Sequence, residues 1–333
     1  MAKVRSLRGA LRPALQIAVI LAITCALVEL GARAVEQRWI YVPNHPIFFW
    51  HMADPYLAWR NDIRSAKRVG LPIDERGYQV YHGKNAAPDA PTVLCIGDSG
   101  TLGIWSDGMV YFDSYAEFLA DDLACTIVNT GTIGYTSWHA VRVLKEYDGP
   151  HDAVVERIGW NDHAHGNTME LRNANSQVAA RLRKFATGRL LLSSMWRPQA
   201  PRRSAISLEE FKVNLSIVAH IAREKGAPLF YIDYPVHLTE VNIKKTPEYL
   251  STHEGVAQSI PELEAVHKKY VDATRAIAKQ ENQHFVETPL SSEFFSEVDA
   301  VHPNAEGARN TANYIAQAFV SAKLPRFDKA SAN

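Results

Sequence analysis

From about residue 91 onward, short apolar runs alternate along the chain with longer amphipathic segments. The apolar runs have the length and composition of buried strands, and they lie at 92–97, 124–129, 152–158, 227–233 and 284–287. The amphipathic segments predict helices, and they lie at 111–122, 137–147, 207–225, 261–280 and 304–321. Strands and helices that alternate in this way predict a parallel sheet with helices on both sides. We therefore expect an α/β fold: a three-layer α/β/α sandwich with a central parallel five-stranded sheet.

Residues 1–35 follow a different pattern. Basic side chains and no acidic ones precede an apolar run that extends from Pro13 to Val28. Because basic flanks stay on the cytoplasmic side of a membrane, this pattern predicts an N-terminal transmembrane helix with the rest of the chain outside the cytoplasm. A cleaved signal peptide is the alternative, since Ala32-Arg33-Ala34 is a weak cleavage site.

The other segments complete the domain organisation. Residues 36–90 are rich in aromatic residues and proline, and we interpret them as a membrane-proximal strap and linker packed on the domain. The main domain spans 91–324, and 325–333 form a tail. Two insertions interrupt the domain: 163–206, and the polar loop 236–260. The first insertion contains a basic amphipathic patch, either an ordinary solvated helix or one that lies on a membrane or covers a site, with the basic residues Arg181, Arg183, Lys184 and Arg189.

The composition limits the class of partner. Lys plus Arg number 36 and Asp plus Glu number 36, so the formal net charge is zero. A nucleic-acid-binding protein normally has a basic excess, and we expect no nucleic-acid partner. Cys25, Cys95 and Cys125 form no C-x-x-C pair and no zinc spacing, so we expect no structural disulfide. The oligomeric state stays open.

A serine directly follows the first predicted strand of the domain. The apolar run Val93-Leu94-Cys95-Ile96 is ended sharply by Gly97-Asp98-Ser99-Gly100. Ligands of open α/β sheets bind at this carboxyl edge, where N–H groups that begin a helix can hold an oxyanion. A simple Ser/Asp helix cap is the alternative interpretation. Three further polar or glycine-containing blocks are expected at the same edge: Asn129-Thr130-Gly131, Gly159-Trp160-Asn161-Asp162 and Asp299-Ala300-Val301-His302.

Together, in this order and spacing, these blocks resemble those of the SGNH hydrolase superfamily, also called GDSL esterases and lipases. The resemblance covers about residues 91–322 and implies the flavodoxin-like SGNH fold. The preceding apolar helix and the turn Arg76-Gly77-Tyr78 are similar to membrane-anchored bacterial members. Gly100 is a departure, because the family often has leucine or another bulky apolar residue there. This difference affects the shape of the pocket floor.

The resemblance implies a role for each block. Ser99 is the expected nucleophile, and His302 is the base that activates it and then protonates the leaving alcohol. Asp299 is expected to orient the imidazole and stabilise its charged form. The backbone N–H groups of Ser99 and Gly131 and the side-chain amide of Asn161 are the expected oxyanion hole.

Other residues are weaker candidates for function. Gly100 and Trp160 are candidate substrate contacts. Tryptophans near the blocks can stack on a sugar ring, although packing explains them equally well: Trp105, Trp138 and Trp160. His163 and His165 suggest a metal pair, but no third ligand is evident and the mechanism needs no metal, so we expect no metal and no other cofactor. Asp162 is expected to bind backbone N–H groups and not to act as a base.

These observations predict a serine-dependent esterase that hydrolyses carboxylic esters, of acetyl or short acyl groups, through an acyl-enzyme. The expected substrate is a small-molecule or carbohydrate acyl ester, including one carried by an envelope polymer. The expected location is the bacterial cell membrane, single-pass, with the domain on the periplasmic or extracytoplasmic side. Two alternatives remain: an O-acyltransferase that uses the same triad, and a non-catalytic binding protein that retains the fold.

Overall fold

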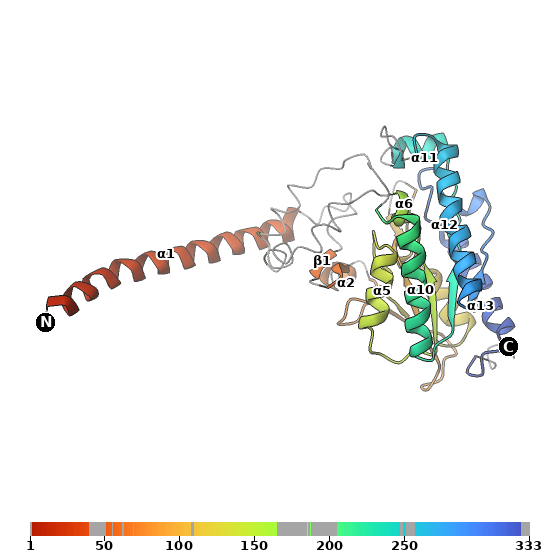
Figure 1. Cartoon of the computed structure of the whole chain (residues 1–333), viewed down its shortest axis with the longest axis horizontal. Coiled ribbons are helices and arrows are strands. Elements are labelled where there is room, and N and C mark those ends of the chain that lie inside the picture. Colours follow the sequence, from red (N-terminus) through yellow and green to blue (C-terminus); the bar gives the residue numbers. More distant parts are fainter. Residues whose placement is uncertain are drawn as a thin grey trace.

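The described part of the chain consists of a long N-terminal helix and an α/β domain (Figure 1). The computed structural model describes residues 2–39, 51–164, 185, 187 and 205–327, apart from 55, 62, 69, 108–109, 247–248 and 251–256.

A six-stranded sheet forms the centre of the domain, with the strand order β10-β9-β8-β4-β7-β3. Its strands are β3 (Gln79–His82), β4 (Thr92–Gly97), β7 (Thr126–Asn129), β8 (Ala153–Arg157), β9 (Leu229–Ile232) and β10 (His284–Val286). The five strands from β10 to β7 run parallel, as predicted. The sheet continues beyond the prediction, because β3 pairs with β7 in the antiparallel direction.

The additional strand comes from the segment that the sequence indicated as a strap. A turn delivers it to the sheet: the Asp74 carboxylate accepts hydrogen bonds from the backbone N–H groups of Arg76 and Tyr78, each at 2.9 Å. β3 is only four residues long and lacks the apolar run of a buried strand. Edge strands of this kind leave little hydrophobic signal, so the sequence pattern did not predict it.

Helices cover both faces of the sheet (Figure 1). The helices on one face are α5 (Ser137–Glu146), α10 (Leu208–Glu224) and α12 (Ile260–Gln280), and those on the other are α4 (Tyr115–Asp122) and α13 (Ala305–Ser321). β4 is buried on both faces, since Leu94 and Ile96 belong to the first core while Val93 and Cys95 belong to the second. Side chains that alternate along a strand explain this division.

Short elements connect these layers. They are β1 (His51–Asp54), β2 (Ala58–Asn61), α2 (Ile63–Arg68), α3 (Ser99–Leu102), β5 (Ile104–Ser106), β6 (Val110–Phe112), α6 (Trp160–Ala164), α11 (Glu240–Lys245) and the 3-10 helix η2 (Ser292–Phe294). The start of the helix predicted at 111–122 differs, because β6 pairs with β5 as a hairpin and the Ser114 side chain caps α4. The loop expected at 236–260 contains α11, which the Thr239 hydroxyl caps.

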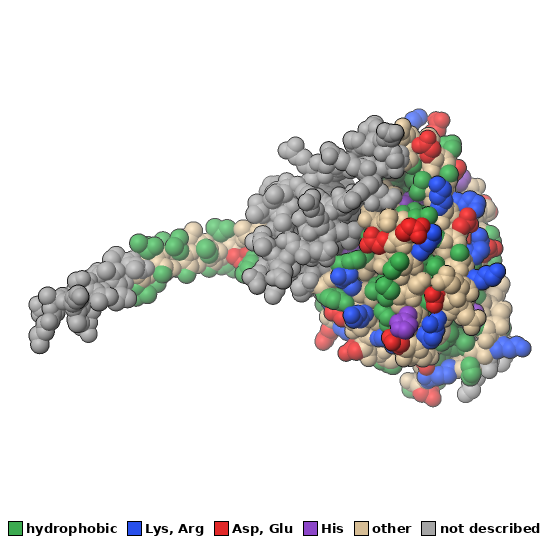
Figure 2. All heavy atoms as spheres, in the orientation of Figure 1, with side chains coloured by type: hydrophobic (Ala, Val, Ile, Leu, Met, Phe, Trp, Pro, Cys, Tyr) green, Lys and Arg blue, Asp and Glu red, His purple; other side chains and the backbone are tan. Residues whose placement is uncertain are grey.

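The N-terminal helix α1 (Ala2–Trp39) extends away from the domain, and its large apolar side chains between Leu15 and Leu30 are exposed (Figure 2). Its span Leu15–Ala34 has 20 residues and a mean hydropathy of 2.2. Among the described residues, it is the one helix long and apolar enough to cross a membrane. A membrane anchor and a signal sequence share these properties.

The first insertion contacts this helix through a described residue. The Glu29 carboxylate accepts hydrogen bonds from the Thr187 backbone N–H at 3.1 Å and from its hydroxyl at 2.8 Å, and it also pairs with Arg33 at 3.0 Å. The basic patch predicted within 163–206 lies outside the described residues.

Asp162 and Glu156 carry carboxyl groups that are buried in the core of the domain. Asp162 accepts hydrogen bonds from the backbone N–H and the hydroxyl of Ser137, at 3.0 and 2.6 Å, so it ties its loop to the start of α5 as expected. Burial nevertheless raises the pKa of Asp162 from 3.8 to about 8, because it outweighs the hydrogen bonds from Ser137. Burial also raises the pKa of Glu156 well above its ordinary value.

The raised pKa of Asp162 makes stability depend on pH. Its folded-state pKa of about 8 lies above the ordinary 3.8, so the group stabilises the fold below pH 4 and loses that contribution as pH rises to about 8. Asp162→Asn should remove at least about 1 kcal/mol of the fall in unfolding free energy between pH 5 and 8. Urea unfolding at several pH values measures this fall. The control is Asp272→Asn at an exposed site whose pKa is lowered, and equal pH slopes for the two variants would contradict the assignment.

Candidate active site

Ser99 is presented at the carboxyl end of the central strand by a sharp turn. β4 ends at Gly97, and Asp98 caps α3, because its side chain accepts a hydrogen bond from the Gly100 N–H at 2.9 Å. A Cβ at Gly97 would lie 2.0 Å from the Thr101 hydroxyl, so only glycine permits α3 to fold back this closely. Ser99 is therefore the first residue of a short helix, where backbone N–H groups have no acceptor within the helix.

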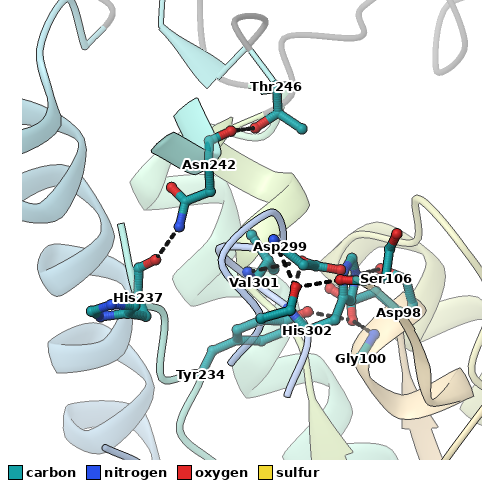
Figure 3. Close-up of polar contacts among 12 residues, drawn as sticks. Asp98, Gly100, Ser106, Tyr234, His237, Asn242, Thr246, Asp299, Val301 and His302 are labelled. Atoms are coloured by element: carbon teal, nitrogen blue, oxygen red, sulfur yellow. Dashed lines mark hydrogen bonds and ion pairs between the residues drawn. The ribbon is translucent and has the colours of Figure 1, made fainter. Parts of the chain in front are cut away.

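His302 and Asp299 reach Ser99 from the loop before α13. The Ser99 Oγ lies 2.7 Å from His302 Nε2, and His302 Nδ1 lies 2.9 and 3.0 Å from the two Asp299 oxygens. Asp299 Oδ1 also accepts hydrogen bonds from the backbone N–H groups of Val301 and His302, which fix the loop around the carboxylate. Figure 3 shows Asp299 and His302 converging on the turn that carries Asp98 and Gly100.

The carboxylate and the imidazole shift each other's pKa. Burial alone would raise the pKa of Asp299, but the charge and hydrogen bonds of His302 outweigh burial and lower it. Burial alone would lower the pKa of His302, but the Asp299 carboxylate outweighs it and raises that pKa above 6.5. Asp299 thus stays ionised and His302 is a stronger base than a free imidazole.

Gly131 and Asn161 lie beside the turn, with their N–H groups donating to oxygens of the protein. The Gly131 N–H donates to Asn129 Oδ1 at 2.8 Å. The Asn161 side-chain amide donates to Asp98 Oδ2 at 3.2 Å and to the Tyr135 carbonyl at 3.0 Å. Both expected oxyanion donors therefore lie against the turn that carries Ser99, Asn161 through its bond to Asp98 and Gly131 beside Thr101 and Leu102.

Residues of the segment before the domain support the second block, which the sequence did not predict. The Asn61 amide donates to the Gly131 carbonyl at 2.9 Å, and Asn129 donates to Gln79 Oε1 at 2.6 Å. Asn61 is 4% exposed and Gln79 is fully buried. An isolated polar residue in a segment without a hydrophobic period gives no sign of its role in the sequence. Its burial in the structure indicates that its side chain has a hydrogen-bond partner.

Trp160 and Gly100, the two candidate substrate contacts, both lie against other groups of the protein. Trp160 is 1% exposed, and its ring packs against His163, Tyr249 and His267, which is the position that the packing alternative describes. The space in front of Gly100 is filled, because a Cβ there would lie 2.7 Å from the Tyr234 hydroxyl.

The histidine after the third block has a protein partner. His163 Nε2 lies 2.8 Å from His267 Nδ1, and both side chains are buried. His165, its expected companion, lies outside the described residues.

A family model that matches residues 95–309 decides the classification; it is that of the GDSL-like lipase/acylhydrolase family. The chain belongs to this family. Its members hydrolyse esters, and this GDSL-like protein is an ester-hydrolysing enzyme. None of the curated proteins matches the chain.

Solved structures of similar fold include proteins of this class. A carbohydrate acetylesterase from Sinorhizobium meliloti is 15% identical with a TM-score of 0.44, over 70% of this chain and 99% of the other. A catalytic mutant of an acetylxylan esterase from Geobacillus stearothermophilus is 18% identical with a TM-score of 0.39, over 69% and 93%. A GDSL-like lipase from Bacteroides thetaiotaomicron is 14% identical with a TM-score of 0.43, over 72% and 92%.

The raised pKa of His302 places the acid limb of activity. His302 must be neutral to accept a proton, so kcat/KM on a small acyl ester should fall at acid pH with an apparent pKa above 6.5. A pH–rate profile from pH 5 to 9 measures this value. An acid limb below pH 6.5 would show that Asp299 does not raise the pKa of the catalytic base.

Proposed function

We propose that this GDSL-like hydrolase removes a short acyl group from a hydroxyl of a carbohydrate or envelope polymer, by serine chemistry, outside the cytoplasmic membrane. The observation that carries the proposal is the continuous hydrogen-bond chain from Ser99 through His302 to Asp299. A serine hydroxyl needs an adjacent base to attack an ester, and the base needs a group that fixes its tautomer. The three side chains have this arrangement.

The geometry supports the following sequence of steps. Ser99 Oγ attacks the ester carbonyl carbon while its proton passes to His302 Nε2, and Asp299 accepts the Nδ1–H of the resulting imidazolium. The tetrahedral intermediate then expels the alcohol, which takes the proton from His302, and leaves an acyl-Ser99 ester. Water attacks this ester with His302 again as base, and the collapse releases the carboxylic acid and free Ser99.

The negative oxygen of the intermediate needs donors beside Ser99. The Ser99 N–H at the start of α3 supplies one. Gly131 and Asn161 supply the others when a substrate oxygen replaces one of their present acceptors. Asn161 can do so by exchanging its bond to Asp98, which at 3.2 Å is the longer of its two present hydrogen bonds.

Two features support a short acyl group on a sugar. Below the turn, the Tyr234 hydroxyl and the Arg157 guanidinium fill the space in front of Gly100, so an acyl chain finds no room there. At the rim, Trp105 stacks on Tyr111 with their ring centroids 4.5 Å apart, and both rings are half-buried. This hairpin contacts the His302 loop, since the Ser296 hydroxyl donates to the Ser106 carbonyl. A half-exposed aromatic surface suits the apolar face of a sugar ring.

The helix α1 supports the proposed location. The apolar span Leu15–Ala34 and the basic residues before it support an uncleaved anchor with the domain outside the cytoplasm. Glu29 contributes further support, because it lies in the C-terminal part of the span and its carboxylate binds Thr187 of the first insertion. A helix that contacts the mature domain is better explained as an anchor than as a removed signal.

The esterase proposal is tested by covalent labelling and product analysis. A fluorophosphonate should label Ser99 in the wild type and not in Ser99→Ala, as peptide mass spectrometry detects. Acetylated sugars incubated with the enzyme should yield free acetate, while acetyl transfer to a second sugar without free acetate would establish the acyltransferase alternative. If Ser99 is not labelled and neither free acetate nor an acetylated second sugar forms, only a binding function remains.

The oxyanion role of Asn161 separates it from a purely structural amide. Asn161→Ala should lower kcat on a small acyl ester by about 10²–10³ with a smaller effect on KM, because the donor matters most when charge develops on oxygen. The matched control is Asn214→Ala, which removes another buried amide, one that donates to Ser137 at 2.9 Å. Equal kcat losses in the two variants, with unchanged circular dichroism, would assign Asn161 a structural role.

The topology proposal is tested in cells. The full chain should remain in the membrane fraction after carbonate extraction and keep its N-terminal residues, as intact-mass measurement shows. A reporter enzyme that works only outside the cytoplasm should be active when it is fused after Asn333. A mature protein that begins near Ala34 would establish the signal-peptide alternative.

A further inference from the structure

An arginine is buried beside the nucleophile turn. Arg157 is the last residue of β8 and is 1% exposed, and it lies opposite Gly97 of β4 in the sheet. It is the only Lys or Arg among the buried side chains of the described residues. A buried cation is costly unless neighbouring groups compensate it, so its position next to Ser99 needs an explanation.

The guanidinium contacts the turn and an aromatic ring. Its carbon lies 4.4 Å from the centre of the Tyr234 ring, and Nη1 lies 3.5 Å from the Gly100 carbonyl oxygen. A tyrosine ring attracts a cation at this distance, most strongly away from water. Within the described residues, Nε and Nη2 have no hydrogen-bond partner, so the contacts with Tyr234 and Gly100 hold the group in place.

Tyr234 connects the guanidinium to the acid of the turn. Its hydroxyl donates to Asp98 Oδ1 at 2.9 Å, the same oxygen that accepts the Gly100 N–H. Asp98 is fully buried, and its other oxygen accepts from Asn161. Arg157, Tyr234 and Asp98 thus form one buried assembly that contacts both the Ser99 turn and a proposed oxyanion donor.

The assembly occupies the place of the missing side chain at position 100. A Cβ on Gly100 would lie 2.7 Å from the Tyr234 hydroxyl and 3.2 Å from Arg157 Nη1. In this chain the space is filled from β8 and from the segment after β9.

We propose that Arg157 and Tyr234 are positioning residues, which fill the space in front of Gly100 and hold Asp98 and the Ser99 turn in the reactive geometry. This inference rests on the proposed function, because it assigns these residues to the reaction of Ser99. His302 faces three charged groups: Asp299 from its own loop, Asp98 from the end of β4 and Arg157 from the end of β8. The carboxylates raise the pKa of His302 and Arg157 lowers it, so the assembly also affects the base.

The test uses the rate at which a fluorophosphonate labels Ser99, which needs no knowledge of the natural substrate. Tyr234→Phe removes only the hydroxyl that binds Asp98, and the labelling rate should fall about tenfold. The matched control is Tyr231→Phe, which removes a buried hydroxyl that donates to the Leu215 carbonyl at 2.6 Å, away from the site. Equal rates for the two variants would overturn the proposal.

Arg157→Met adds a readout that a structural role would not move. Loss of the cation should shift the acid limb of the labelling rate to higher pH by about half a unit to one unit, while Arg157→Lys, which keeps the charge, should shift it less. An unshifted limb in a folded Arg157→Met variant contradicts the proposal. If that variant does not fold, the Tyr234→Phe comparison decides.

A compensation experiment tests the occupied space directly. Gly100→Ala should slow labelling strongly, because its Cβ meets the Tyr234 hydroxyl. Gly100→Ala combined with Tyr234→Phe should label faster than Gly100→Ala alone, since the shortest of the contacts that the new Cβ makes is removed. Additive losses would overturn the proposal. A wild type that the reagent does not label at Ser99 would instead overturn the proposed function, and this inference with it.

Discussion

The pairing of β4 with its two neighbours is the constraint on which the whole site depends. In this register Cys95 lies opposite Asn129 of β7, and Gly97 lies opposite Arg157 of β8. Because parallel strands end at the same edge, the residues that follow them meet above that edge. A shift of one residue in either pairing would turn buried side chains to the wrong face and move the blocks apart.

The fourth block reaches the same edge through helix packing. His302 is 203 residues from Ser99 in the sequence, and their side chains are joined by a 2.7 Å hydrogen bond. The loop that carries His302 is fixed at its C-terminal end, since Asn304 caps α13 by accepting the Gly307 N–H at 3.0 Å. α13 in turn buries Ala312, Ile315 and Phe319 on the sheet. A hydrophobic face far from the chemistry therefore sets the position of the imidazole.

The sequence predicted the parts of this arrangement that have a strong period or a sharp break. Buried parallel strands are apolar throughout, and Gly-Asp-Ser ends one of them abruptly, so the strand ends and the candidate triad could be located. β3 could not, because an edge strand of four residues has no distinctive pattern. The burial of Trp160 could not be predicted either, since an aromatic residue beside a block has the same sequence signature whether it faces a ligand or the core.

The residues that hold the site in place could not be predicted from the sequence either, for a different physical reason. Asn61, Gln79, Arg157 and Tyr234 act through hydrogen bonds or charge across the fold, and these contacts depend on three-dimensional placement and not on spacing in the chain. In a sequence, polar residues of this kind indicate exposed positions. Their burial identifies them, because a buried polar group without a partner destabilises the fold.

Gly100 shows how one departure from a family pattern is absorbed. Loss of a side chain at this position would leave a void under the nucleophile, and an apolar void beside a polar turn destabilises both packing and geometry. Here a tyrosine and an arginine fill the void. Polar groups impose directions that an apolar side chain does not, so the turn is fixed by hydrogen bonds to Asp98 in addition to packing. Arg157, which helps to fill this space, also brings a positive charge close to His302. The shape of the site and the basicity of its imidazole are consequently linked in this enzyme.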